Sequence, residues 1–301
     1  MISPDGSTLY YLDVEPGRAG IWTASIDGQN PIQMVSGHIA SSYGSQAFLS
    51  PDGNHLAYFM YEGLKTTLYT LPVNGGSARK LFTSDHQQGQ TPAWSPDSEE
   101  IAFVDGKDLF VISAQGGRPE SIATSKEWEG WMVEWSPNGR HVAGFGFEEG
   151  EENNVLYIVD RDSKERKRVT PPEESGYKEI FNWHPDGDRI SYMYYGPDWE
   201  RDGSQVISID GGAPKPFAQM PAPMWDYVGV WGPDHRYYFI SVGWNNAWGL
   251  YSTDEESNEF TTIRQLSDRS VNLPNWSEDG SVIAWSETES SRQLWMLTDY
   301  E

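Results

Sequence analysis

The chain has 301 residues, of which 37% are hydrophobic and 14% aromatic, and its formal net charge at pH 7 is −24. A surface this acidic repels nucleic-acid phosphates, so we expect no nucleic acid among the partners. The absence of cysteine excludes disulfides, thiolate metal sites and cysteine nucleophiles. No apolar run reaches the roughly 18 residues that a membrane span needs, so we expect none.

A four-residue turn motif recurs seven times, at intervals of 41 to 48 residues. In this motif proline presets φ, aspartate bonds back to the backbone, and glycine accepts a positive φ. Each copy therefore predicts a tight hairpin between two antiparallel strands. In chain order the copies are Ser3-Pro4-Asp5-Gly6, Ser50-Pro51-Asp52-Gly53, Ser95-Pro96-Asp97-Ser98, Ser136-Pro137-Asn138-Gly139, His184-Pro185-Asp186-Gly187, Gly232-Pro233-Asp234-His235 and Ser277-Glu278-Asp279-Gly280.

The residues around each turn follow strand patterns. An apolar run precedes the turn and ends in tryptophan in five copies, and an alternating run such as 55–59 or 189–193 follows it. After a variable loop comes a third strand, and a polar turn then leads to a fourth in most units. The third strands are marked in chain order by Ile21-Trp22, Leu68-Tyr69, Leu109-Phe110, Leu156-Tyr157, Val206-Ile207, Leu250-Tyr251 and Leu294-Trp295.

Four short strands repeated at this period are typical of propeller blades. We therefore predict one all-β domain over 1–301, a seven-bladed β-propeller of four-stranded antiparallel blades with incomplete terminal blades. The first blade lacks most of its first strand and the last ends after its third, so we expect a fragment of a longer chain or an open seam. Open edges favour association, here a dimer. The predicted blades are 1–41, 42–87, 88–126, 127–172, 173–222, 223–268 and 269–301.

The copy Trp94-Ser95-Pro96-Asp97 followed by Ile101-Ala102-Phe103 resembles the WD-repeat-like unit of the TolB-like propeller family. Similar repeats occur in periplasmic TolB, in the propellers of prolyl-oligopeptidase-like and tricorn-like proteases, and in oligogalacturonate lyases. The resemblance covers essentially the whole chain and implies the fold. A periplasmic or extracellular location is favoured by this resemblance alone, and a cytoplasmic location is the alternative. The chain lacks the Gly-x-Ser-x-Gly elbow of a peptidase and the His-x-His metal motif associated with the lyases.

Six of the 14 tryptophans fit no strand position of the repeat and lie in or beside variable loops of units four to six. Variable loops on a rigid scaffold commonly bind ligands, and tryptophan and tyrosine dominate binding hot spots. The alternative is that these rings pack under long loops as small cores. The predicted ligand-binding residues are Trp128, Trp131, Tyr177, Trp199, Trp225, Tyr227, Trp244, Trp248, Gln88 and Asp226.

Catalytic candidates are few. His38 and His86 occupy comparable positions in adjacent units and could act as acid and base together with Arg269; exposed loop histidines are the alternative. Other polar candidates near the predicted central opening include Lys178 and Glu179. We predict no metal and no cofactor, with a structural Ca²⁺ at the acidic run 148–152 as the alternative.

The function that these features favour is non-catalytic binding of a protein segment or glycan on the variable-loop face, because no complete catalytic motif is present. A carbohydrate-active, lyase-like enzyme is the first alternative, on the strength of the tryptophan cluster. The second is a propeller domain of a larger receptor, sensor or protease. Fold alone does not choose among them.

Overall fold

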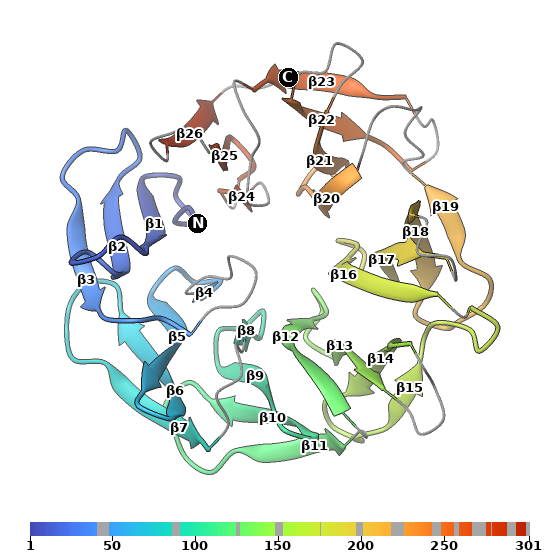
Figure 1. Ribbon diagram of the computed structural model, residues 1–301, viewed down its shortest axis with the longest axis horizontal. Helices are drawn as coiled ribbons and strands as arrows, with labels where there is room; N and C mark the ends of the chain where they lie inside the picture. Colours follow the sequence, from blue (N-terminus) through green and yellow to red (C-terminus); the bar gives the residue numbers. More distant parts are fainter. Residues whose placement is uncertain are drawn as a thin grey trace. The chain divides into compact units, whose positions relative to one another are not determined.

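The computed structural model describes residues 1–40, 48–85, 91–124, 127–147, 153–174, 176–196, 201–217, 226–242, 248–255, 259–266, 275–277, 279–287 and 293–298, some of them by backbone alone. Their regular structure consists of 26 β-strands in seven antiparallel sheets, in each of which neighbouring strands follow chain order (Figure 1). In this part of the chain no helix has the length and hydrophobicity that crossing a membrane requires.

The chain divides into two compact units, the first formed mainly by Gln29–Val169 and the second mainly by Thr170–Glu301. Thr8–Ser25 and Met1 belong to the first unit, and Ile2–Ser7 and Ile26–Gly28 to the second. The first unit holds β1 (Thr8–Asp13), β2 (Gly20–Ser25) and β3 (Ile32–Ser36); β4 (Phe48–Leu49), β5 (His55–Glu62), β6 (Lys65–Pro72) and β7 (Arg79–Ser84); β8 (Ala93–Trp94), β9 (Glu100–Asp105), β10 (Asp108–Ser113) and β11 (Glu120–Thr124); and β12 (Glu127–Trp135), β13 (His141–Phe147), β14 (Val155–Asp160) and β15 (Arg166–Arg168).

The second unit holds three sheets. They comprise β16 (Tyr177–Trp183), β17 (Arg189–Tyr195), β18 (Arg201–Ser208) and β19 (Lys215–Phe217); β20 (Asp226–Trp231), β21 (Tyr237–Val242), β22 (Trp248–Thr253) and β23 (Thr261–Gln265); and β24 (Asn275–Trp276), β25 (Val282–Glu287) and β26 (Gln293–Thr298). Each predicted repeat thus forms one sheet, and every predicted third-strand dipeptide lies in a strand. Five sheets have four described strands, whereas the sheets β1–β3 and β24–β26 have three.

The predicted turn chemistry is confirmed at atomic level. In five turns the hydroxyl of the leading serine donates to the aspartate or asparagine two residues later at 2.5 to 2.8 Å. In four of these turns the same hydroxyl accepts the backbone N–H five residues later, as Ser50 does from His55. The last motif position has φ between 63 and 75° in all seven turns, including Ser98 and His235 where glycine is absent. The motif therefore closes each hairpin locally.

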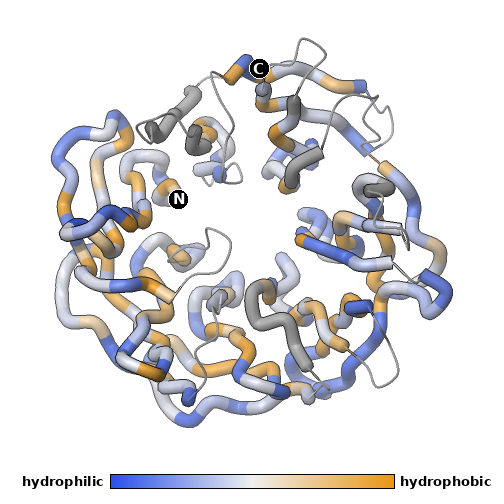
Figure 2. The backbone as a smooth tube through the Cα atoms, in the orientation of Figure 1, coloured by the Kyte–Doolittle hydropathy of each residue, from blue (hydrophilic) through white to orange (hydrophobic). Residues whose placement is uncertain are grey.

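The tryptophans before the turns connect neighbouring sheets. Trp94 Nε1 donates to the carbonyl of Phe48 at 2.9 Å, and Trp135 Nε1 donates to the carbonyl of Ala93 at 3.1 Å. In both pairs the acceptor lies in the first strand of the preceding sheet. The rings are buried in the clusters between sheets. Figure 2 shows hydrophobic residues recurring along the strands and hydrophilic residues in many of the turns. The repeated tryptophan is thus a structural residue.

Candidate functional site

The first strands of three sheets are long and irregular. β12, β16 and β20 span nine, seven and six residues, whereas β4, β8 and β24 span two each. Each long strand contains a register shift, between Trp128 and Val133, between Glu179 and Phe181, and between Asp226 and Gly229. Bulges of this kind are common beside binding and active sites, where they redirect side chains. These strands carry five of the predicted ligand-binding residues: Trp128, Trp131, Tyr177, Asp226 and Tyr227.

The bulge in β16 is centred on Ile180, whose φ of 45° is rare for a β-branched residue. Such strain persists where the surroundings determine the backbone, and it is concentrated at functional sites. Before the bulge Tyr177 is paired with Tyr195 and Glu179 with Met193, while Lys178 is paired with Tyr194. Because successive side chains alternate between the two sides of a strand, Tyr177 and Glu179 share one side and Lys178 lies on the other.

Tyr177, Glu179 and Tyr195 form what we call the tyrosine–glutamate face, at the end of the sheet away from the His184–Gly187 turn. The hydroxyl of Tyr195 donates to Glu179 Oε2 at 2.9 Å. The two tyrosine rings lie 6.4 Å apart at 48°, tilted rather than stacked on each other. All three side chains are partly exposed. The arrangement presents two aromatic rings and a carboxylate whose position is held by a hydrogen bond.

On the other side Glu174, Lys178 and Tyr192 form a buried clamp. Lys178 is only 1% exposed; its Nζ donates to the carbonyl oxygen of Glu174 at 2.7 Å and lies 3.7 Å from the carboxylate Oε2 of the same residue. The hydroxyl of Tyr192 lies 2.9 and 3.1 Å from the two oxygens of that carboxylate, to which it donates. Burial raises the pKa of the Tyr192 phenol, and the neighbouring Glu174 charge raises it further. Tyr192 therefore remains a neutral donor that holds Glu174.

Gly176 is needed for this packing. A Cβ at this position would come within 2.0 Å of the carbonyl oxygen of Tyr195 and 2.5 Å of the Tyr194 ring. The Nζ of Lys178 lies 5.8 Å from the centre of the same Tyr194 ring. The segment that enters β16 is thus fitted closely to the end of β17.

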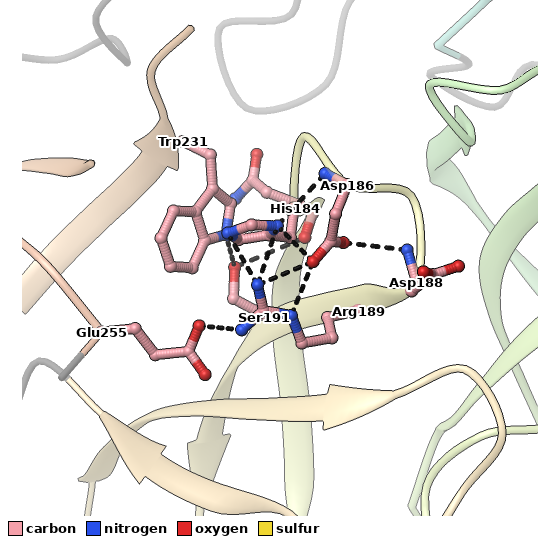
Figure 3. A network of polar contacts seen from close by, with 8 residues as sticks. His184, Asp186, Asp188, Arg189, Ser191, Trp231 and Glu255 are labelled. Carbon is pink, nitrogen blue, oxygen red and sulfur yellow. Dashed lines mark hydrogen bonds and ion pairs between the residues drawn. The ribbon is translucent and has the colours of Figure 1, made fainter. Parts of the chain in front are cut away.

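The opposite end of this sheet carries a polar network (Figure 3). His184 Nδ1 lies 2.9 Å from Asp186 Oδ2, and Arg189 Nη2 lies 2.7 Å from the same oxygen. Arg189 Nη1 forms an ion pair with Glu255, which follows β22 in the next sheet. The Trp231 ring packs edge-on at 4.4 Å from the His184 ring, and Trp231 Nε1 donates to Ser191 Oγ at 2.9 Å. Two neighbouring sheets of the second unit are therefore joined at the turn end.

Burial lowers the pKa of His184 below its ordinary value near 6.5; Asp186 opposes this shift and Arg189 adds to it. For Asp186, burial alone would raise the pKa, but the N–H of Asp188, the Arg189 guanidinium and His184 together lower it. The folded state therefore favours a neutral His184. The stabilisation of the folded state by neutral His184 is complete above the unfolded-state pKa of this residue. It is lost progressively as the pH falls from that value through the lower pKa of the folded state.

We accordingly expect the free energy of unfolding to fall more between pH 7 and pH 5 in the wild type than in His184→Ser. The substitution introduces the serine that leads five of the other six turns, and its hydroxyl can donate to Asp186 and accept from the N–H of Arg189. Denaturant titrations at both pH values measure the difference. His38→Ser, which changes an exposed histidine, is the control and should retain the wild-type pH dependence. An equal loss in wild type and His184→Ser would contradict this role of His184.

The remaining predicted residues are placed as follows. Trp248 begins β22 and packs partly buried against the cluster that includes Tyr238 and Leu250. His38 is exposed, and its carbonyl accepts the N–H of Tyr61 at 3.1 Å. The side chains of Trp128, Trp131, Asp226 and Tyr227 lie outside the described part, as do residues Gln88, Trp199, Trp225, Trp244, His86, Arg269 and the run 148–152.

Tyr177, Lys178 and Glu179 belong to a paired strand. One correction follows: Lys178 is buried instead of facing the predicted central opening. The sequence analysis does not identify Glu174 and Tyr192 as members of the buried clamp. The one signal in the sequence is the spacing of four residues between Glu174 and Lys178. Among the described residues no three histidine, aspartate or glutamate side chains gather as metal ligands would.

No protein-family model and no curated protein sequence matches this chain. Solved structures do. An oligogalacturonate lyase from Vibrio parahaemolyticus matches with a TM-score of 0.76 at 13% identity, over 99% of this chain and 88% of that one. TolB from Acinetobacter baumannii matches with a TM-score of 0.59 at 14% sequence identity, over 97% of this chain and 76% of that one. A prolyl endopeptidase matches with a TM-score of 0.68 at 12% sequence identity, over 98% of this chain and 49% of that one.

The fold is that of a β-propeller. Identities this low show the fold alone: an all-β propeller with four-stranded antiparallel blades. The propeller neighbours include a lyase, TolB and a peptidase, so the fold is shared among proteins of different function. The function has to be argued from the residues of the site.

Proposed function

We propose that this propeller is a non-catalytic binding protein that takes a glycan or protein segment at the tyrosine–glutamate face. The observation that carries the proposal is the pairing of Tyr177 and Tyr195 beside Glu179, partly exposed at the end of a rigid sheet. Tyrosine rings combine a flat apolar surface with a polar group, which suits recognition. We also propose that the seven sheets are seven blades, and that the protein is periplasmic or extracellular, by likeness to TolB structures.

The buried clamp supports binding rather than catalysis. Lys178 is in contact with Glu174, and both lie beneath the surface. The raised pKa of Tyr192 prevents it from acting as a base at neutral pH. These groups hold the end of β16 in place, and a pre-ordered surface binds with less loss of conformational freedom.

The proposal is tested by titrating the protein with a glycan panel and with extended peptides, with binding measured by calorimetry and tryptophan fluorescence. Tyr177→Ala should weaken binding about tenfold, or by roughly 1.4 kcal/mol, because truncation of an important interface residue costs more than about 1 kcal/mol and tyrosine is enriched among such residues. Tyr61→Ala is the matched control, because Tyr61 is an exposed strand tyrosine of the first unit. Unchanged affinity in a folded Tyr177→Ala protein would refute the site, and chemical conversion of the glycan would show an enzyme instead.

A further inference from the structure

We infer that the tyrosine–glutamate face is a subsite for an uncharged sugar ring. This inference rests on the proposed function and narrows its ligand from two classes to one. Its basis is the combination of two ring faces with a carboxylate on the same side of β16 and β17. Three observations support it: the ring geometry, the local charge and the irregular edge of β16.

The ring geometry suits a pyranose. Tyr177 and Tyr195 are tilted by 48° with centroids 6.4 Å apart, so the two rings do not cover each other's faces. A pyranose presents apolar C–H groups on its faces and hydroxyl groups around its rim. A tyrosine face accommodates the C–H groups through apolar contact. The rim hydroxyls then need acceptors close to the same ring.

Glu179 supplies such an acceptor. An ionised carboxylate accepts about four hydrogen bonds, of which the hydroxyl of Tyr195 provides one. That bond also fixes the carboxylate beside the Tyr195 ring. A sugar hydroxyl donating to Glu179 forms a charge-assisted hydrogen bond, which is stronger than one between neutral groups.

The local charge disfavours an acidic sugar. Glu179 is itself negative, and the whole chain carries a net charge of −24. The nearest described cation along the strand, Lys178, lies on the other side of the sheet, where it contacts Glu174. Arg201, which is paired with Tyr195 across β17 and β18, is described by its backbone alone. Among the described side chains of the face, a uronate would therefore meet only the like charge of Glu179. Like-charge juxtaposition weakens association and excludes wrong partners.

The edge of β16 disfavours an extended peptide. Among the described strands β16 is the first of its sheet and pairs only with β17, so its other edge is where a peptide strand would add. The bulge at Ile180 interrupts the regular spacing of backbone groups along this strand. Bulges are one of the devices by which proteins block pairing at sheet edges. Recognition by side chains, as a glycan requires, does not depend on that edge.

The test measures affinity by calorimetry for cellohexaose, xylohexaose and mannohexaose, for hexagalacturonate as the acidic counterpart, and for a ten-residue extended peptide. We expect at least one neutral hexamer to bind about tenfold more tightly than hexagalacturonate and the peptide. Tyr177→Ala should weaken that binding about tenfold, and Glu179→Gln roughly fivefold because the charge-assisted bond is lost. Glu179→Gln should also reduce the difference in affinity between the neutral hexamer and hexagalacturonate, because it removes the negative charge of the face.

Glu173→Gln is the matched control, because it removes one exposed negative charge outside the face and should leave every affinity unchanged. Thermal melts establish that each variant is folded. Failure of all three neutral hexamers, or tighter binding of hexagalacturonate, would overturn the uncharged-sugar inference. If the peptide binds instead and Tyr177→Ala abolishes its binding, the inference falls while the proposed binding function stands. If no ligand depends on Tyr177, both fall.

Discussion

Lys178→Met is expected to lower the free energy of unfolding by about 3–5 kcal/mol, because it leaves the carboxylate of Glu174 buried without its cation. Lys178 and Glu174 side chains are 1% and 8% exposed, so water cannot replace the lost partner. Methionine retains much of the volume of lysine, which limits any cavity. Urea titration of the purified protein measures the loss through the midpoint at constant slope.

The double variant Glu174→Gln with Lys178→Met should recover most of that loss. Glutamine is uncharged, and its side-chain oxygen can still accept the hydroxyl of Tyr192. Lys80→Met is the comparison for an exposed pair, since Lys80 lies 3.3 Å from Glu62 with 53% of its side chain exposed. Exposed pairs contribute about 0–1 kcal/mol. If Lys178→Met lowers the free energy of unfolding no more than Lys80→Met does, the buried clamp does not hold the end of β16 in place.

Trp231→Ala should lower the free energy of unfolding by about 3–5 kcal/mol, as large-to-small changes at buried aromatic positions do. The Trp231 ring is stacked on Phe217 at 5.4 Å and meets Tyr237 edge-on at 5.2 Å. It also packs edge-on against His184. Removing it leaves a cavity between two sheets of the second unit. Thermal and denaturant unfolding both report the loss.

Two smaller changes separate the ring from its hydrogen bond. Trp231→Phe keeps most of the apolar contact but removes the donor to Ser191, which is 1% exposed, so we expect a cost of about 1–3 kcal/mol. Ser191→Ala removes the acceptor and leaves the indole N–H buried, with a similar cost. A loss for Trp231→Phe equal to that for Trp231→Ala would assign the whole effect to the hydrogen bond and contradict the packing argument.

Local chemistry could be predicted from the sequence because it depends on residues close together in the chain. The Ser-x-Asp bonds within the turns, the positive φ at the last turn position and the third-strand dipeptides all arise within a few residues. The tryptophan before the turn was assigned correctly because it recurs with the repeat. Its partner in the preceding sheet, such as Ala93 for Trp135, follows once neighbouring repeats pack.

The site could be predicted only in part. Tyr177 was expected to contribute to binding, and its pairing with Tyr195 now places it beside Glu179. The alternation of 177–183 looks regular, and nothing in it indicates that Ile180 breaks the ladder. The burial of Lys178 was likewise unexpected, because charged residues next to loops are usually exposed.

Sequence alone is enough to locate the repeats, the described sheets along the chain and the chemistry of the turns, because each repeat encodes its own hairpins. The side of β16 that each polar residue faces depends on tertiary packing, since one bulged residue reverses the alternation. Tertiary packing also decides that Glu174 and Tyr192 enclose Lys178, because a buried charge is stable only where neighbouring segments supply its partners.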